Sequence, residues 1–365
     1  MKHYHVLIAI LVGILIVIVQ PQLIRAHYLD PDLVLKQKGE NYPVLTIAYG
    51  VETLGKPYET TSIATDAKVK DFLIQGKHKY DRREYKDALQ DYTQALQIDP
   101  KNAYIYQLRG NAYYSLKDYR RAITDYTQAL QIAPNNSTTY GWRGDALANL
   151  KNYQGAIEDY TRALQIDPNN PISAINYKAR GFTRALLGDK QGAIADYTQA
   201  LQINPNNAGA YYYRGNVHHS LKDYQLAIAD YTQALRINPN NADAYYNRGN
   251  AHALLGEKQG AIDDYNQALQ INPNNSKAYN NRANAYHDLK DYKRAIDDYN
   301  QALRINPNNA DAYNNRGNAH ALLGEKQGAI DDYNQALRIN PNNSNAYNNR
   351  GNAYQGLKDY KRAID

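Results

Sequence analysis

Residues 242–275 read ADAYYNRGNAHALLGEKQGAIDDYNQALQINPNN, and residues 310–343 repeat this stretch with two differences. Tyr246 becomes Asn314 in the second copy, and Gln270 becomes Arg338. A different stretch of the same length separates the copies, which indicates that a pair of repeats was duplicated as one block. Self-similarity at a fixed period of this length is typical of repeat proteins, in which each repeat is one supersecondary structure.

The same period runs through most of the chain. Prolines recur every 34 residues, except for one step of 37 between Pro168 and Pro205. The extra residues of that step, 171–173, predict a lengthened turn between two repeats. The period gives eight full repeats and a truncated ninth: 69–102, 103–136, 137–170, 174–207, 208–241, 242–275, 276–309, 310–343 and 344–365.

Each repeat carries small and aromatic residues at helical spacing. Tyr106 and Gly110 lie four residues apart in the first half of one repeat, and Ala122 and Tyr126 do so in its second half. Such spacing places the marked residues on one stripe of each of two helices. Asp118 is predicted to cap the second helix, and the Pro-Asn-Asn that follows ends it and caps the next one. Each repeat is therefore predicted to be a helix–turn–helix that buries its apolar face by stacking on its neighbours.

This repeat resembles the tetratricopeptide repeat in its length and in its Gly, Tyr, Ala, Tyr, Ala and Pro positions. The resemblance covers about residues 69–365. It implies an all-α fold, a right-handed superhelical solenoid of tandem helix–turn–helix repeats over residues 66–365.

One departure from the family is regular: arginine stands where the family usually has leucine before the glycine, and aspartate precedes the tyrosine of the second helix. The arginines and aspartates are predicted either to pair at helix contacts or to leave the arginine exposed with its stem along the helix. The arginines are Arg109, Arg143, Arg180, Arg214, Arg248, Arg282, Arg316 and Arg350, and the aspartates include Asp125, Asp159, Asp196, Asp230, Asp264, Asp298 and Asp332.

The N-terminus has the pattern of a membrane signal. Lys2 precedes an uninterrupted apolar run over residues 6–19, which is typical of a secretory signal peptide. Continued to residue 24, the apolar segment nearly reaches the length of about 20 residues that spans a bilayer. Residues 1–26 are therefore either a signal peptide cleaved after Ala26 or a retained transmembrane anchor. In both cases we expect a membrane-anchored or exported protein, periplasmic or otherwise extracytoplasmic. Residues 27–65, interrupted by prolines and glycines, are predicted to be a linker.

Composition and motifs argue against catalysis. The 365 residues include no Cys, which excludes disulfides, thiolate nucleophiles and thiolate zinc sites. The net charge of +6 is not concentrated in a stripe, so nucleic acid is not an expected partner. The chain contains no phosphate-binding loop, nucleophile elbow or dinucleotide fingerprint. We therefore predict a protein that is not an enzyme and needs no cofactor.

Recurring histidines and paired acids have a structural explanation. His218, His252 and His320 hold one position in different repeats, a position that other repeats fill with tyrosine. Side chains at equivalent positions of stacked repeats form a ladder and do not converge on one ion, so packing is favoured and no metal site is predicted. Pairs such as Asp263 and Asp264 are neighbours on a helix and do not face each other, so no catalytic residue is predicted.

The candidate binding site follows from the family resemblance, because first helices line a concave groove that holds partner segments. Asparagine amides both donate and accept hydrogen bonds and suit an extended peptide backbone. The alternative is that copying multiplied one ancestral asparagine without selection for binding. The predicted groove residues are Tyr212, Asn216, Tyr246, Asn247, Asn250, Asn281, Asn284, Asn315 and Asn318.

The sequence thus favours a scaffold that binds other proteins or peptide segments in its concave groove, at or beyond a membrane. The alternative is a substrate-recruiting arm of a larger enzyme whose catalytic domain lies beyond residue 365. The last repeat stops inside its second helix, and its open edge is expected to promote self-association. Gly215 is expected at a helix contact, whereas Asn216→Ala is expected to weaken partner binding and cost little stability.

Overall fold

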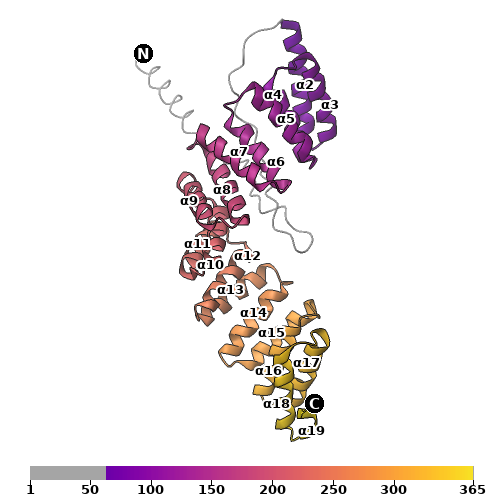
Figure 1. Cartoon of the computed structure of the whole chain (residues 1–365), viewed down its shortest axis with the longest axis vertical. Helices are drawn as coiled ribbons and strands as arrows, with labels where there is room; N and C mark the ends of the chain where they lie inside the picture. Colours follow the sequence, from indigo (N-terminus) through magenta and orange to yellow (C-terminus); the bar gives the residue numbers. More distant parts are fainter. Residues whose placement is uncertain (1–62, 365) are drawn as a thin grey trace, which may run out of the picture. The chain divides into compact units, whose positions relative to one another are not determined.

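The computed structural model describes residues 63–364, in which every regular element is an α-helix (Figure 1). The predicted membrane signal at residues 1–26 lies outside the described residues. The chain divides into two compact units, residues 1–168 and 169–365, which we call the N-terminal and C-terminal units. The predicted all-α fold of tandem helix–turn–helix repeats is confirmed.

The helices have nearly constant lengths. The N-terminal unit contains α2 (Ile63–Asp81), α3 (Tyr85–Ile98), α4 (Ala103–Ser115), α5 (Tyr119–Ile132), α6 (Ser137–Asn149) and α7 (Tyr153–Ile166). The C-terminal unit contains α8 (Pro171–Leu186), α9 (Lys190–Ile203), α10 (Ala208–Ser220), α11 (Tyr224–Ile237), α12 (Ala242–Leu254), α13 (Lys258–Ile271), α14 (Ser276–Asp288), α15 (Tyr292–Ile305), α16 (Ala310–Leu322), α17 (Lys326–Ile339), α18 (Ser344–Gly356) and α19 (Tyr360–Ile364).

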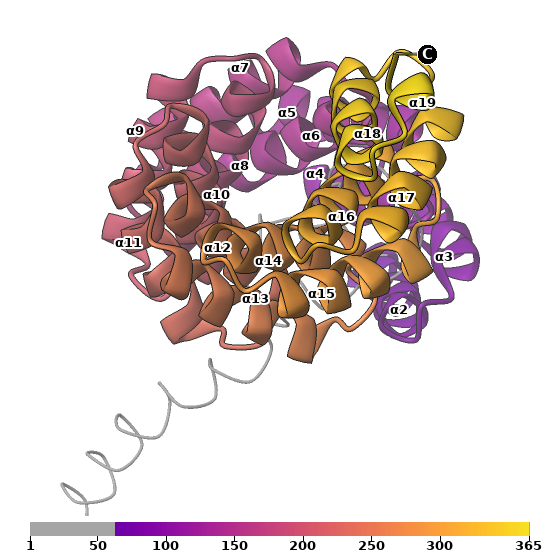
Figure 2. The ribbon, with the colours of Figure 1, turned by 90° about the horizontal axis from the view of Figure 1, so that it is seen from below.

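Even-numbered and odd-numbered helices have different roles. Within each unit, an even-numbered helix packs on the odd-numbered helix that follows it, and that helix packs on the next even-numbered one. In the C-terminal unit, Figure 2 shows α10, α12, α14 and α16 on the inner side of the curve and α11, α13 and α15 on its outer side. The even-numbered helices of this unit therefore form its concave face, as the family resemblance implies.

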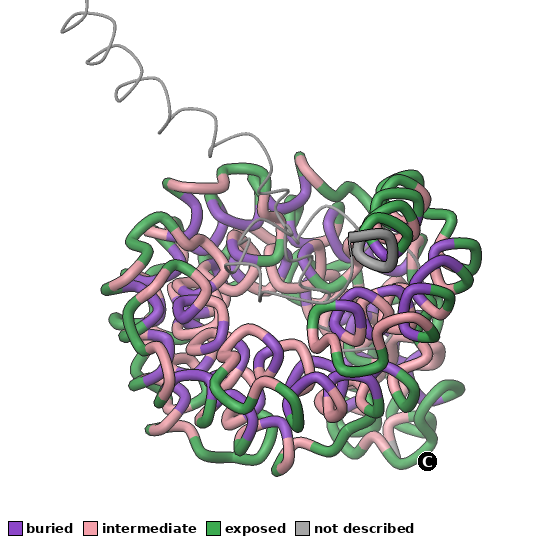
Figure 3. The backbone as a smooth tube through the Cα atoms, turned by 90° about the horizontal axis from the view of Figure 1, so that it is seen from above, coloured by how far each residue is buried: buried purple, intermediate pink, exposed green. Residues whose placement is uncertain are grey.

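The core repeats one contact between glycine and tyrosine. Tyr231 on α11 is 1% exposed, and a Cβ added at Gly215 on α10 would lie 2.8 Å from its ring Cε1 atom. Alanines and leucines on both sides of the tyrosine complete each buried layer, and the buried positions alternate with exposed ones along the helices (Figure 3). The expectation that Gly215 lies at a helix contact is confirmed.

The turns between helices contain the predicted caps. The side chain of Asp118 accepts a hydrogen bond from the backbone N–H of Arg121, at 3.1 Å, at the start of α5. The second asparagine of Pro-Asn-Asn has the same role for the even-numbered helices, as when Asn241 accepts from the N–H of Ala244 at 3.0 Å. Both caps satisfy amides that a helix start leaves without an intrahelical partner.

The prediction of a lengthened turn at residues 171–173 was wrong. Helix α8 begins at Pro171 and has 16 residues, whereas most even-numbered helices have 13. Proline suits the first position of a helix because its φ is already helical and the missing N–H would have no partner there. Asn170 caps the extended helix through the N–H of Ser173, so the insertion lengthens the helix and not the turn. At the other end, α2 begins at Ile63, inside the predicted linker.

The predicted arginine–aspartate pairs are present. Arg214 on α10 donates two hydrogen bonds to Asp230 on α11, at 2.8 and 2.7 Å. The same guanidinium donates to Thr198 on α9 at 2.9 Å and lies over the ring of Tyr211. The hydrogen bond to Asp230 raises the pKa of Arg214, which therefore stays charged. Equivalent pairs join Arg109, Arg143, Arg180, Arg248, Arg282 and Arg316 to Asp125, Asp159, Asp196, Asp264, Asp298 and Asp332.

The turn inside each repeat gives a first prediction about stability. One residue of this turn has a left-handed conformation, with φ of 63° at Lys290 but 80° at Gly256, where glycine holds the same place. A left-handed conformation costs a residue with a Cβ about 1–2 kcal/mol, and glycine avoids this cost. Part of the advantage is offset because glycine loses more conformational entropy on folding. Lys290→Gly is therefore expected to raise the free energy of unfolding by about 1 kcal/mol, and Gly256→Lys to lower it similarly. Urea denaturation of both variants measures this, and a shift of both in one direction would contradict it.

Candidate functional site

The nine predicted groove residues all lie on even-numbered helices of the C-terminal unit and are all partly exposed. Their arrangement is a hydrogen-bonded ladder along the concave face. We use the name asparagine ladder for Asn216, Asn247, Asn250, Asn281, Asn284, Asn315, Asn318 and Asn349.

Each step of the ladder joins two successive even-numbered helices. The amide Nδ2 of Asn247 on α12 donates to Oδ1 of Asn216 on α10 at 3.0 Å. Asn281 donates to Asn250 in the same way at 2.9 Å. The remaining two steps run from Asn315 to Asn284 and from Asn349 to Asn318. These residues therefore contribute to the contact between neighbouring repeats.

A buried tyrosine hydroxyl fixes the orientation of each accepting amide. Tyr231 donates to Oδ1 of Asn216 at 2.8 Å, and Tyr333 donates to Oδ1 of Asn318 at 2.8 Å. Burial raises the pKa of Tyr333 to about 12, so its hydroxyl is neutral and donates at physiological pH. Tyr265 and Tyr299 donate to Asn250 and Asn284 in the same way. Because Oδ1 receives two donors, the Nδ2 group must point away from the tyrosine.

The ladder therefore contains two kinds of asparagine. Asn247 donates to both Asn216 and the Tyr212 hydroxyl, and Asn281 donates to both Asn250 and the Tyr246 hydroxyl, so both protons of each amide are used. By contrast, the Nδ2 groups of the accepting residues make no hydrogen bond within residues 63–364, and they are not buried. These four free donors, one in each repeat, belong to Asn216, Asn250, Asn284 and Asn318.

This geometry changes one expectation. Asn216→Ala would remove the acceptor of the buried Tyr231 hydroxyl and of the Asn247 amide. A buried polar group without its partner costs about 1–3 kcal/mol, so the substitution should lower stability as well as binding. The sequence could not show that Asn216 is already an acceptor for two donors inside the protein.

An aromatic pair interrupts the ladder on α8 and α10, and sequence reasoning missed it. Phe182 and Tyr213 hold the positions of Asn216 and Asn247, and their ring centroids lie 5.3 Å apart in an edge-to-face arrangement. In each pair the two residues are 31 positions apart in the sequence. This equal spacing is the signal that could have revealed an aromatic pair in place of an asparagine pair. The interruption leaves the Tyr197 hydroxyl without an acceptor, although the tyrosine is 0% exposed.

A matched pair of substitutions tests the ladder's contribution to stability. Tyr231→Phe removes a made hydrogen bond and should lower the free energy of unfolding by about 1 kcal/mol. Tyr197→Phe removes a buried hydroxyl that has no partner and should leave stability unchanged or raise it. Thermal and urea denaturation of both variants provides the measurement. Equal losses would show that the Asn216 bond contributes nothing.

Histidine and acidic side chains meet elsewhere in the repeat. His252 Nδ1 lies 2.5 Å from Glu257 Oε2, and His252 Nε2 lies 3.8 Å from Oδ2 of Asp264, which Arg248 already neutralises. The side chains of His320 and Glu325 repeat the contact at 2.5 Å. Within residues 63–364, no group of three or more His, Cys, Asp or Glu side chains could hold a metal ion.

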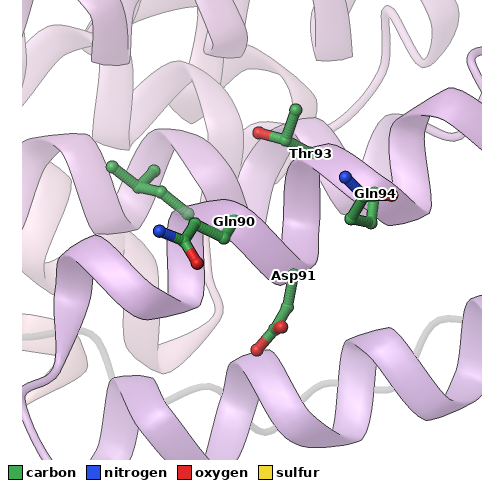
Figure 4. A pocket seen from close by; sticks show the side chains of 5 residues that line it. Gln90, Asp91, Thr93 and Gln94 are labelled. Carbon is green, nitrogen blue, oxygen red and sulfur yellow. The ribbon is translucent and has the colours of Figure 1, made fainter.

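A shallow pocket of about 440 Å³ lies on α3 of the N-terminal unit (Figure 4). Asp91 in this pocket is the counterpart of the buried aspartates, but Gln75 stands where its arginine would be, and Lys79 pairs with it at 2.8 Å. The other lining residues, Leu89, Gln90, Thr93 and Gln94, come from the same helix. Because its lining comes from α3 alone and the charge of Asp91 is already paired with Lys79 of α2, this pocket is not a candidate site.

The described helices give no membrane-spanning segment: between residues 63 and 364, none is both long and apolar enough to cross a bilayer. What they define is an α-helical repeat protein whose concave face carries an ordered row of amides. Protein-family models described as "TPR repeat" and "Tetratricopeptide repeat" match the sequence, and together they cover more than half of it. The chain belongs to the tetratricopeptide-repeat family. The matched residues are 76–117, 184–222, 215–256, 283–324, 242–275, 310–343, 108–171, 264–297 and 332–365.

Several solved structures are similar to parts of this chain. MamA is 27% identical, with 46% of this chain and 92% of that chain covered and a TM-score of 0.45. YrrB, described as a TPR protein with an unusual peptide-binding site, is 24% identical over 52% of this chain and 96% of its own, with a TM-score of 0.48. PilF of Pseudomonas aeruginosa is 18% identical over 57% and 94%, with a TM-score of 0.52, a likeness of fold. No curated protein matches the sequence.

Proposed function

We propose that this chain is a protein-interaction scaffold that binds partner segments in extended conformation along α10, α12, α14 and α16. Repeat solenoids bind their partners on extended concave surfaces. The observation that supports this face most directly is the row of free amide donors at Asn216, Asn250, Asn284 and Asn318. Each of these repeats has one such donor, and a buried tyrosine hydroxyl fixes the orientation of its amide.

The chemistry of the donors favours an extended segment over a helix. Backbone carbonyls are strong acceptors, and those inside a helix are already paired with their own N–H groups. An extended segment keeps its carbonyls free, so it can accept from several of the fixed amides at once. Because the amides are ordered before binding, little side-chain entropy is lost on complex formation, which favours affinity.

The experiment exploits an exchange that the chain itself contains. Asp145 on α6 holds the ladder position in the N-terminal unit and accepts from the Tyr160 hydroxyl at 2.6 Å. Asn250→Asp and Asn284→Asp should therefore keep the internal bonds while replacing a free donor by an acceptor that repels peptide carbonyls. We expect at least a tenfold loss of affinity for 15-residue peptides selected from a displayed random library against the full chain.

Asn274→Asp is the matched control, because Asn274 is exposed in a turn and its side chain makes no hydrogen bond within the described residues. It introduces the same charge away from the ladder and should leave peptide affinity unchanged. Fluorescence anisotropy measures all three variants, and circular dichroism checks that they are folded. Equal affinities in the ladder variants and the control would contradict the proposal.

We also propose that residues 1–26 place this scaffold at or beyond a membrane, either as an anchor or as a cleaved signal. The apolar run over residues 6–19 supports this proposal. Membrane fractionation of the full chain and of a chain lacking residues 1–26, with N-terminal sequencing of the product, is the test. Recovery of both chains in the same soluble fraction with an intact N-terminus would contradict it. Self-association through the edge of the last repeat stays a prediction.

A further inference from the structure

Leucine alternates with polar residues one helical turn beyond the ladder. Leu254 follows Asn250 by four residues and Leu322 follows Asn318 by four, so each leucine lies on the same face of its helix as a free donor. Leu254 is 57% exposed and Leu322 is 56% exposed. At the equivalent positions, α10 has Ser220 and α14 has Asp288, so exposed leucine recurs every second repeat in this part of the face.

A single exposed leucine needs no functional explanation, because much of any protein surface is apolar. Here Leu254 and Leu322 recur in register with the free donors of Asn250 and Asn318. Leu186 on α8 continues the alternation, although its repeat is not one of the two nearly identical copies. The pattern is therefore wider than the duplicated block.

A partner that binds this face must match both the exposed leucines and the free amide donors. A lipid surface would desolvate the ion pair that Asp288, on the helix between the two leucines, forms with Lys258 at 3.6 Å, and both side chains of this pair are exposed, at 58% and 36%. An amphipathic helix could cover the leucines but would offer no free carbonyls to the amides. An extended peptide satisfies both, since it has free carbonyls along its backbone and can present apolar side chains at chosen intervals.

We infer that the partner is an extended segment with two aliphatic side chains about six residues apart, one packed on Leu254 and the other on Leu322. The side chains between them are polar where they face Asp288. This inference rests on the function proposed above and adds the partner's sequence requirement to it. The spacing follows from helix packing: neighbouring axes lie about 8–10 Å apart, so two repeats span about 16–20 Å, which an extended chain covers in about five to six residues at about 3.3 Å each.

The test uses labelled peptides of 13 residues with a serine–glycine background. One series carries two leucines at positions i and i+3, i and i+6, or i and i+9, and a control peptide carries no leucine. Fluorescence anisotropy with the full chain should show the tightest binding for the separation of six, at least tenfold tighter than for the leucine-free peptide. Equal binding of all the leucine peptides would overturn the inference.

Variants separate this inference from the function on which it rests. Leu254→Asp and Leu322→Asp give α12 and α16 the residue that α14 already has at the equivalent position, Asp288. Each variant should remove the tenfold preference for the leucine peptide over the leucine-free peptide. Leu226→Asp is the control, because Leu226 is 53% exposed but belongs to α11. Asn250→Asp should weaken all the peptides, including the leucine-free one.

The outcomes differ for the two ideas. Loss of binding in Asn250→Asp with no effect of either leucine variant would overturn the leucine sites and keep the asparagine donors. Loss of the preference in Leu254→Asp with unchanged binding in Asn250→Asp would overturn the donors and keep the leucine sites. An equal loss in Leu226→Asp would overturn the assignment of the face.

Discussion

Arg248→Met is expected to lower the free energy of unfolding by about 3–5 kcal/mol, the usual cost of removing one partner of a buried ion pair. Arg248 donates to both carboxylate oxygens of Asp264, at 2.8 and 2.6 Å, and the aspartate side chain is only 6% exposed. Without the guanidinium the carboxylate would stay buried, with the nearest histidine nitrogen, that of His252, 3.8 Å away. Urea denaturation followed by circular dichroism measures the loss.

Two further variants test whether the unpaired charge of Asp264 causes the loss of stability in Arg248→Met. Arg350 makes no pair with an aspartate within residues 63–364 and donates instead to Asn334 at 2.9 Å, so Arg350→Met should cost no more than about 1 kcal/mol. The double variant Arg248→Met with Asp264→Leu should recover most of the stability, because a buried ion pair can often be replaced by apolar residues without loss. A double variant as unstable as the single one would show that the charge of Asp264 is not the cause.

The arginine also explains the regular departure from the family pattern. Arg248 lies on α12, pairs with α13, and donates to Thr232 on α11 at 2.9 Å, so one side chain joins three consecutive helices. Leucine at this position could pack but could not orient a carboxylate. The sequence allowed two interpretations, pairing or exposure, because spacing alone does not show which way a long side chain turns. The structure supports pairing in all seven complete cases.

The fold was predictable because its determinants are local and repeated. Glycine, alanine and tyrosine at helical spacing, proline after the second helix and asparagine before the next one each specify one element, and each recurs with the period. The helical insertion at Pro171 was not predicted because proline is common both at the first position of a helix and shortly after the end of one. Only the cap from Asn170 distinguishes the two cases.

The row of asparagines on the first helices could be predicted from the sequence, but its hydrogen bonding could not. All the ladder asparagines look alike in the sequence, yet Asn247 uses its amide protons internally and Asn250 does not. The difference depends on tyrosine hydroxyls that lie 15 residues further along the chain, as Tyr265 does from Asn250. A regular separation of this kind is visible in the sequence, but it becomes meaningful only once the helix pair is folded.

Gly215→Leu is expected to lower the free energy of unfolding by about 1–3 kcal/mol or more, because it overfills the contact between α10 and α11. A Cβ at Gly215 would lie 2.8 Å from Cε1 and 2.9 Å from Cδ1 of Tyr231, whose ring is almost fully buried and cannot swing into solvent. A leucine adds three more carbons beyond that Cβ. Thermal and urea denaturation of the full chain measure the loss.

Gly215→Ala is the control that the chain itself suggests. Ala283 holds the glycine position on α14, where Tyr299 is still only 1% exposed, so a single methyl group can be accommodated beside the ring. Alanine also gains about 1 kcal/mol over glycine in a helix interior, which offsets part of the close contact. Gly215→Ala should therefore change stability by less than about 1 kcal/mol in either direction, and Ala283→Gly should lower it by about 1 kcal/mol. If Gly215→Leu were as stable as Gly215→Ala, the tyrosine would have to move aside freely, and the tight contact between glycine and tyrosine could not be what fixes the distance between the two helices.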